Sequence, residues 1–250
     1  MTDWIFLRGL TRESRHWGTL PQRWQAAGLG TPLAVDLPGN GRLCHEVSPA
    51  NVPGLVASVR ESLRHADRLR RCRVLAMSLG AMVAAEWARQ YPDEVAALVL
   101  INTSMRPFST MTQRLRPANW PDLLRMAAAW ENRDYCEHTI HRLTCGRRDA
   151  EEDDILMWRQ IAASAPVTRN SALRQLLAAA RYRAARRPPC PSTLLIASDA
   201  DRLVNPVCSD QLARMWGVPL LRHPWAGHDL PHDDPDWLCD MVARQIKTAA

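Results

Sequence analysis

Six short apolar runs, separated by helix-like stretches, limit the folds that are open to this 250-residue chain. The runs are rich in β-forming residues, and several are apolar throughout instead of alternating with polar residues. They are Trp4–Leu7, Leu33–Val35, Arg73–Met77, Ala96–Ile101, Thr193–Ala197 and Pro219–Leu221. Apolar runs of this kind are typical of parallel strands that are buried on both faces of a sheet.

The stretches between these runs have apolar residues that recur at three- and four-residue steps, which is the period of an amphipathic helix. They are Trp17–Ala27, Val52–Leu69, Gly80–Gln90, Val207–Trp216 and Pro235–Lys247. Strands that alternate with helices predict an α/β fold: a doubly wound, mostly parallel sheet of about six strands.

The alternation stops after Asn102, and roughly 85 residues of helix-like sequence precede the next strand at Thr193. Prolines lie at both ends of this block, within 104–107 and 186–191, and prolines mark the ends of helices. We therefore expect a core domain formed by residues 1–104 and 189–250, with residues 105–188 inserted as a helical cap. The chain length suits one such domain.

The bulk composition is that of an ordinary globular protein, with 46% hydrophobic and 23% charged residues. The N-terminus does not resemble a signal peptide, and no run of about 18 apolar residues occurs, so a cytoplasmic location is the expectation. The seven cysteines contain no CxxC pair, which argues against a disulfide framework or a zinc ribbon. We expect reduced and mostly buried thiols.

The positive charge is concentrated in the predicted cap. Residues 105–187 hold 15 Arg against 9 acidic residues, which accounts for the whole net charge of +6. One interpretation is a surface for an acidic partner, such as an acyl carrier protein, or for an anionic substrate. The plainer one is that arginines cover solvated helices. No nucleic-acid-binding motif accompanies them, so nucleic acid is not an expected partner.

Ser78 lies between the strand that ends at Met77 and the helix that begins near Gly80. A sharp strand-to-helix turn lifts one side chain clear of the sheet and demands small residues two positions to either side, here Ala76 and Gly80. The helix also directs free N–H groups toward this point, so the amide of Leu79 can stabilise an oxyanion. The alternative is that Ser78 is only an N-cap for the helix.

The segment Ala76-Met77-Ser78-Leu79-Gly80 resembles the G-x-S-x-G nucleophile elbow of α/β-hydrolases, with Ala in place of the first Gly. The resemblance covers most of the chain outside the cap. It implies a Ser-His-Asp triad with Ser78 as nucleophile, and it requires neither a metal nor an organic cofactor.

In this family the acid and then the histidine follow the nucleophile along the chain. Gly227-His228 resembles the family's Gly-His element, so His228 is the predicted base, although His223 and His232 lie nearby. The loop after the strand at Thr193–Ala197 resembles G-x-x-D-x-x-V-x-P with Ser in place of Gly, and this matches Asp201 as the acid, with Asp199 as the alternative. Either Asp side chain is also able to form a plain Asx-turn.

The segment after the first strand, Arg8-Gly9-Leu10, corresponds to the family's His-Gly followed by the second oxyanion donor. The resemblance therefore implies the backbone N–H of Leu10 as that donor, and Arg8 departs from the family pattern. The segment Asp36–Gly41 is interpreted as a structural turn.

The predicted cap contains large apolar side chains beside its arginines: Trp120, Met126, Trp130, Met157 and Trp158. Such a mixture is able to enclose an apolar chain next to an anionic group. The simpler interpretation is that these side chains form the core of the cap.

The sequence thus predicts hydrolysis of a carboxylic ester or thioester, with a small or acyl-chain substrate, through an acyl-enzyme on Ser78. Acyl transfer or a C–C lyase step on the same triad stays open, as does a ligand-binding module that keeps the triad without turnover. Epoxide hydrolases and haloalkane dehalogenases are disfavoured, because those families place Asp at the elbow.

Overall fold

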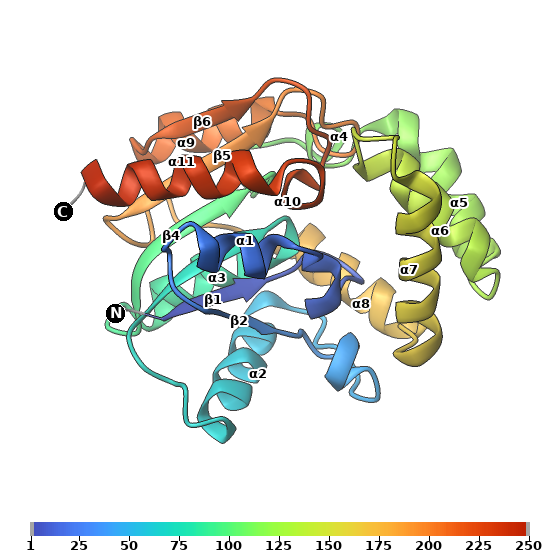
Figure 1. The fold of residues 1–250 in the computed structure, drawn as a ribbon, viewed down its shortest axis with the longest axis horizontal. Coiled ribbons are helices and arrows are strands. Elements are labelled where there is room, and N and C mark those ends of the chain that lie inside the picture. The colour runs from blue at the N-terminus through green and yellow to red at the C-terminus, as the bar shows by residue number, and fades with distance from the viewer. Residues whose placement is uncertain (1–2, 249–250) are drawn as a thin grey trace.

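The computed structural model describes residues 3–248, and its centre is one six-stranded parallel sheet (Figure 1). The strand order is β2-β1-β3-β4-β5-β6, and every neighbouring pair is parallel. The strands are β1 (Trp4–Leu7), β2 (Pro32–Val35), β3 (Cys72–Met77), β4 (Val95–Ile101), β5 (Thr193–Ser198) and β6 (Leu220–His223). The predicted α/β fold with a parallel sheet is confirmed.

Helices cover both faces of the sheet because successive strand residues point to opposite sides. Trp4 and Phe6 pack under one helical layer, and Ile5 and Leu7 pack under the other. The first layer contains α1 (Leu20–Ala26) and α11 (Pro235–Thr248); the second contains α2 (Val52–His65), α3 (Leu79–Gln90) and α9 (Val207–Trp216). Burial on both faces explains why several of the strands are apolar throughout.

Two helix boundaries differ by three or more residues from those expected, and a backbone with positive φ explains both. The helix expected from Trp17 begins at Leu20, because a short 3-10 turn over Ser14–Trp17 ends at Gly18, where φ is 54°. The helix expected to reach Leu69 ends at His65, because Asp67 has a φ of 52°. A further short helix, α10 (Leu230–Asp233), precedes α11 and was not predicted.

The helical region inserted between β4 and β5 is present as predicted. Its helices are α4 (Met111–Arg114), the 3-10 turn Pro117–Asn119, α5 (Trp120–Ala128), α6 (Arg133–Thr144), α7 (Glu151–Ser164) and α8 (Arg169–Arg181). Figure 1 shows α5, α6 and α7 gathered beyond one end of the sheet. This is the end at which the strands finish, because the loops after β1 and β6 bond to Gln175 and Thr144 of the inserted helices. The cap boundaries at 105 and 188 stay a prediction.

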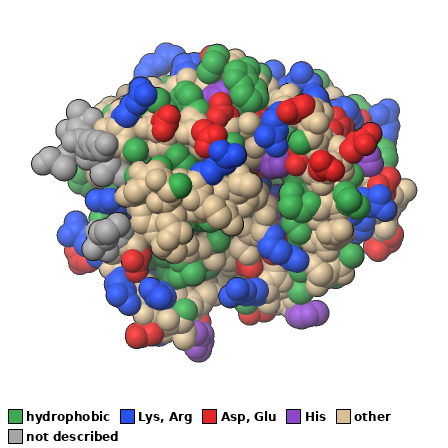
Figure 2. Space-filling view, in the orientation of Figure 1, with side chains coloured by type: hydrophobic (Ala, Val, Ile, Leu, Met, Phe, Trp, Pro, Cys, Tyr) green, Lys and Arg blue, Asp and Glu red, His purple; other side chains and the backbone are tan. Residues whose placement is uncertain are grey.

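The arginines of this region share its surface with acidic side chains. Arg142 pairs with Asp122 at 2.9 Å, and Arg159 pairs with Asp134 at 3.0 Å. Figure 2 shows basic and acidic side chains interspersed on the face that it presents. Paired surface charges of this kind fit the plainer interpretation of the arginine excess. Within residues 3–248, no helix is long and apolar enough to cross a membrane.

Candidate active site

Ser78 occupies a strained turn between β3 and α3, with φ 53° and ψ −119°. Positive φ is costly for a residue with a side chain and is held only where the surroundings impose it. Here the Ser78 N–H donates to the carbonyl of Ile101 at 3.0 Å, and the Thr103 hydroxyl donates to the Ser78 carbonyl at 3.0 Å. The end of β4 therefore holds the turn in place.

Close backbone contact between β1 and α3 explains two of the glycines beside Ser78. A Cβ atom on Gly80 would lie 2.5 Å from the carbonyl oxygens of both Leu7 and Arg8, and a Cβ on Gly9 would lie 3.1 Å from the Ser78 Cβ. Because neither glycine has a side chain, the loop after β1 reaches the serine turn.

This contact brings the two predicted oxyanion donors to Ser78. Leu79 is the first residue of α3, where backbone N–H groups have no partner within the helix. Leu10 follows Gly9, and both leucines line the same cavity as Ser78. Their role as oxyanion donors stays a prediction.

His228 and Asp201 lie together at the carboxyl edge of the sheet. The imidazole Nδ1 is 2.7 Å from Asp201 Oδ2, and the residues are 4% and 2% exposed. The other carboxylate oxygen accepts the backbone N–H groups of Leu203 and Val204 at 2.8 and 2.9 Å. Asp201 therefore makes the Asx-turn that was the alternative and also contacts the histidine.

Burial of the His228 ring disfavours its charged form, but the charge and hydrogen bond of Asp201 outweigh this effect. The pKa of His228 is therefore raised above its usual value of 6.5. With a proton on Nδ1 shared with Asp201, the neutral ring keeps its lone pair on Nε2.

Asn102, at the end of β4, holds the loop that carries His228. Its amide nitrogen donates to the carbonyl oxygens of Gly227 and His228 at 3.2 and 2.8 Å, and its amide oxygen accepts the Ser198 N–H at 2.8 Å. Sequence reasoning missed this residue. The one available signal was a polar side chain directly after a buried strand.

The alternatives to the two predicted residues lie elsewhere. Asp199 is half-exposed and pairs with Arg222 at 2.5 Å. His223 is buried with its Nε2 3.1 Å from Asp234, and His232 is buried with its Nε2 2.8 Å from Asp154. Each therefore has its own structural partner.

Arg8, the departure from the family pattern, forms a buried ion pair with Asp229. Its two guanidinium nitrogens contact the two carboxylate oxygens at 2.9 and 2.5 Å, and its guanidinium lies 4.8 Å from the Trp17 ring. Burial raises the pKa of Asp229, but Arg8 outweighs burial and lowers it overall. Sequence reasoning missed Asp229, although it directly follows the predicted base.

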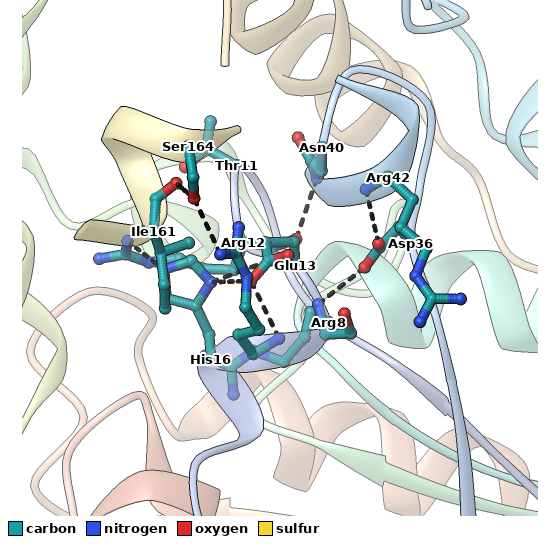
Figure 3. Close-up of polar contacts among 12 residues, drawn as sticks. Arg8, Thr11, Arg12, Glu13, His16, Asp36, Asn40, Arg42, Ile161 and Ser164 are labelled. Carbon is teal, nitrogen blue, oxygen red and sulfur yellow. Dashed lines mark hydrogen bonds and ion pairs between the residues drawn. The ribbon is translucent and has the colours of Figure 1, made fainter. Parts of the chain in front are cut away.

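Arg12 continues this polar layer, and Figure 3 shows it among Glu13, His16 and Asn40. The Asn40 amide donates to the Arg12 carbonyl at 3.0 Å, and the Arg12 guanidinium lies 3.0 Å from His16. Asp36 accepts the backbone N–H of Arg42 at 2.9 Å in the same view. This contact agrees with the interpretation of the segment after β2 as a structural turn.

Two cavities meet at Ser78. One of about 110 Å³ is lined by Leu10, Ser78 and His228 together. The other, of about 260 Å³, extends under the inserted helices. Its apolar lining includes Leu79, Met82, Met111, Leu115, Leu123, Met126, Trp130, Ile140, Leu173, Leu176, Leu203 and Val204. Met126 and Trp130 are therefore at the cavity, whereas Trp158 is buried in the cap core.

One group among the described residues has the donor atoms for a metal ion. His141, Cys145 and His232 offer ligand atoms that all lie within 4.8 Å of one another. Asp154 contacts both imidazoles, at 3.2 and 2.8 Å, so the histidines are satisfied without an ion. All seven cysteines are buried and unpaired, as expected.

Comparison with known proteins agrees with this geometry. The model of the alpha/beta hydrolase family matches residues 4–241. No curated protein matches the chain.

Several solved structures share the fold. One is 2-hydroxy-6-oxo-6-phenylhexa-2,4-dienoate hydrolase from Rhodococcus sp. strain RHA1, with a TM-score of 0.76 and 16% identity, covering 98% of this chain and 90% of that one. An enol-lactonase from Burkholderia xenovorans LB400 has a TM-score of 0.75 at 16% identity, over 98% and 91% of the two chains. A hydrolase from Pseudomonas aeruginosa PA01 has a TM-score of 0.73 at 18% identity, over 98% and 89%. With the family match extending from β1 into the last helix, the chain belongs to the alpha/beta hydrolase family.

Proposed function

We propose that the protein is a serine hydrolase that cleaves a carboxylic ester or thioester through an acyl-enzyme on Ser78. The main support is the buried 2.7 Å contact between His228 and Asp201, in a cavity wall that Ser78 and His228 share. A buried carboxylate on Nδ1 fixes the tautomer whose Nε2 accepts a proton.

In the proposed reaction, Ser78 Oγ attacks the acyl carbon as its proton passes to Nε2 of His228. The N–H groups of Leu10 and Leu79 donate to the oxyanion that forms. The imidazolium, stabilised by Asp201, then gives its proton to the leaving alcohol or thiol. Water, deprotonated by the same imidazole, cleaves the acyl-enzyme and releases the acid.

The low-identity neighbours include an enol-lactonase, whose name denotes cleavage of a cyclic ester, and a dienoate hydrolase, whose named substrate contains a ketone and a carboxylate but no ester. Acyl transfer and C–C cleavage on the same three residues stay alternatives. Product analysis separates hydrolysis from acyl transfer, because hydrolysis releases the free acid, whereas transfer moves the acyl group to an added alcohol. Docking of an acidic acyl carrier protein on the arginine-rich inserted helices also stays a prediction.

The deciding experiment has two parts. The first is labelling with a fluorophosphonate, followed by peptide mapping. The second measures the turnover of a panel of acyl esters and thioesters. We expect modification at Ser78 alone and loss of turnover in Ser78→Ala. Labelling at another serine, or undiminished turnover in Ser78→Ala, would overturn the assignment. Tight ligand binding without turnover of any ester would favour a binding module.

A further inference from the structure

The arginines near Ser78 fall into two groups that differ in their partners. Arg8 and Arg12 line the smaller cavity, and each is paired with a buried carboxylate, Asp229 at 2.5 Å and Glu137 at 2.7 Å. Arg114 lines the larger cavity and is 8% exposed. Its guanidinium donates only to the carbonyl oxygens of Ala179 and Ala180, at 2.6 and 3.2 Å.

The Arg114 guanidinium is therefore buried without a counter-ion among residues 3–248. Its Nε atom is buried and has no hydrogen-bond partner. Burial lowers the pKa of Arg114, and no carboxylate offsets that effect. A buried guanidinium without a counter-ion is costly, and two neutral carbonyl oxygens offset less of that cost than a carboxylate does, so an anionic ligand is a favourable further partner.

The larger cavity contains no acidic residue that could supply this compensation. Its only charged lining residues are Arg114 and Arg169, the first residue of α8, and most of the remaining lining is apolar. Ser78 lies in the wall of the same cavity. A ligand that fills it thus meets a nucleophile, an apolar enclosure and two guanidinium groups.

We propose that this cavity binds an acyl chain that carries a second, anionic group, a carboxylate, and that Arg114 recognises this group. The inference rests on the proposed function, since it names the substrate class of the same site. Arginine suits this role because its planar fork donates two parallel hydrogen bonds to a carboxylate. The apolar lining accommodates the methylene chain between the carboxylate and the ester.

A purely structural role for Arg114 makes a different prediction. The two contacts with Ala179 and Ala180 join α4 to the C-terminal end of α8, where a cation is favourable. If this were its whole role, its replacement would lower stability without changing the preference between charged and neutral substrates.

The test compares 4-nitrophenyl monoesters of straight-chain dicarboxylic acids with 4-nitrophenyl alkanoates of equal chain length. For the wild type we expect kcat/KM to be about tenfold or more higher for the anionic ester. In Arg114→Gln that ratio falls about tenfold. In Arg169→Gln it falls less, because Arg169 is solvent-exposed and lies at the opposite end of α8 from the carbonyl oxygens that Arg114 contacts. The matched control is Arg125→Gln in α5, whose arginine pairs with Asp122 and does not line the cavity.

A wild type that shows no preference for the anionic ester, or a ratio unchanged in Arg114→Gln, would overturn the proposal. If Arg114→Gln does not fold, the Arg114→Lys variant is used instead. Lysine keeps the positive charge but lacks the planar guanidinium with its two parallel donors. A ratio of anionic to neutral ester turnover equal to that of the wild type counts against recognition by Arg114.

Failure of the proposed function is recognised separately, by absent turnover of both esters or turnover that survives Ser78→Ala. Anion recognition is then measured without catalysis, by calorimetric titration of the Ser78→Ala protein with octanoate and with octanol. We expect tighter binding of octanoate, and about tenfold weaker octanoate binding when Arg114→Gln is added. Equal binding of the two ligands would overturn the proposal in this arm.

Discussion

The titration of His228 is set by groups that the structure brings around one imidazole. Burial lowers the pKa of the ring, but the charge and hydrogen bond of Asp201 together with the charge of Asp229 outweigh burial, so the pKa is raised above 6.5. A general base must be neutral to accept a proton, so activity requires a pH above this pKa. We expect kcat/KM to fall as pH decreases, with an apparent pKa above 6.5. A profile that is flat down to pH 5 would contradict the assignment of His228.

The Asp201→Asn variant tests Asp201 as the proposed acid of the triad. An amide in place of the carboxylate favours the wrong tautomer and no longer stabilises the imidazolium, so we expect kcat to fall about 10³- to 10⁴-fold. The control is Asp199→Asn, which removes only a half-exposed pair with Arg222 and should leave kcat unchanged. A larger loss in Asp199→Asn than in Asp201→Asn would exchange their roles.

The Arg8→Gln variant tests the role of the buried ion pair between Arg8 and Asp229. It leaves the Asp229 carboxylate buried and unpaired, which costs about 3–5 kcal/mol in the free energy of unfolding. Arg8 lowers the pKa of His228 and Asp229 raises it, so the substitution should also move the acid limb of the pH profile upward.

The double variant Arg8→Gln/Asp229→Asn removes both charges of that pair. It should recover part of the lost stability and move the acid limb back down. Urea denaturation and pH profiles of the three proteins measure both effects. If the double variant is no more stable than Arg8→Gln, the unpaired Asp229 carboxylate is not the cause of the stability lost in Arg8→Gln.

Among the secondary elements, three helices meet at the Asp154 carboxylate. Asp154 lies in α7, His141 in α6 and His232 in α10, so this contact joins the inserted region to the core. Burial raises the pKa of Asp154, but its hydrogen bonds with the two histidines outweigh burial and lower it well below 3.8. A depressed carboxyl pKa stabilises the folded state above the unfolded pKa, and this stabilisation is lost as pH falls below it.

Asp154→Asn should therefore destabilise the protein by about 1–3 kcal/mol at pH 7, because one imidazole N–H loses its acceptor. The difference from the wild type should shrink near pH 3, where the unfolded-state carboxyl group is protonated. Thermal unfolding at both pH values measures this. Asp153→Asn, at an exposed neighbour in the same helix, is the control and should have little effect. A difference that is equal at both pH values would contradict the ionised contact.

At the scale of the whole molecule, the sequence predicts the fold well because its strands are buried on both faces. Continuous apolar runs mark such strands, and the residues that follow the carboxyl ends of parallel strands meet at one edge of the sheet. This is why the motifs could predict that Ser78, Asp201 and His228 lie at that edge, whereas their catalytic roles stay a prediction. Asn102, Asp229 and Arg114 could not, since their partners lie far away in sequence: Asn102 contacts residue 228, and Arg114 contacts α8. Only tertiary packing reveals which arginine lacks a carboxylate.

The size of the larger cavity predicts that the proposed hydrolysis depends on acyl-chain length. The cavity of about 260 Å³ lies between the sheet edge and the inserted helices, and its lining is mostly apolar. Each buried methylene contributes about 0.8 kcal/mol, so kcat/KM should rise about fourfold per methylene and level off once the cavity is filled. A series of alkanoyl esters of increasing length measures this rise.

Ala172→Phe then places a ring in that cavity from the buried face of α8. We expect the plateau to move to shorter chains while the shortest esters are still cleaved, since the ring takes the space of the distal methylenes. Ala163→Phe, on an exposed position of α7, adds the same side chain outside the cavity and should leave the series unchanged. An equal loss at every chain length in Ala172→Phe would instead indicate general damage to packing, and the acyl chain would then have to lie elsewhere.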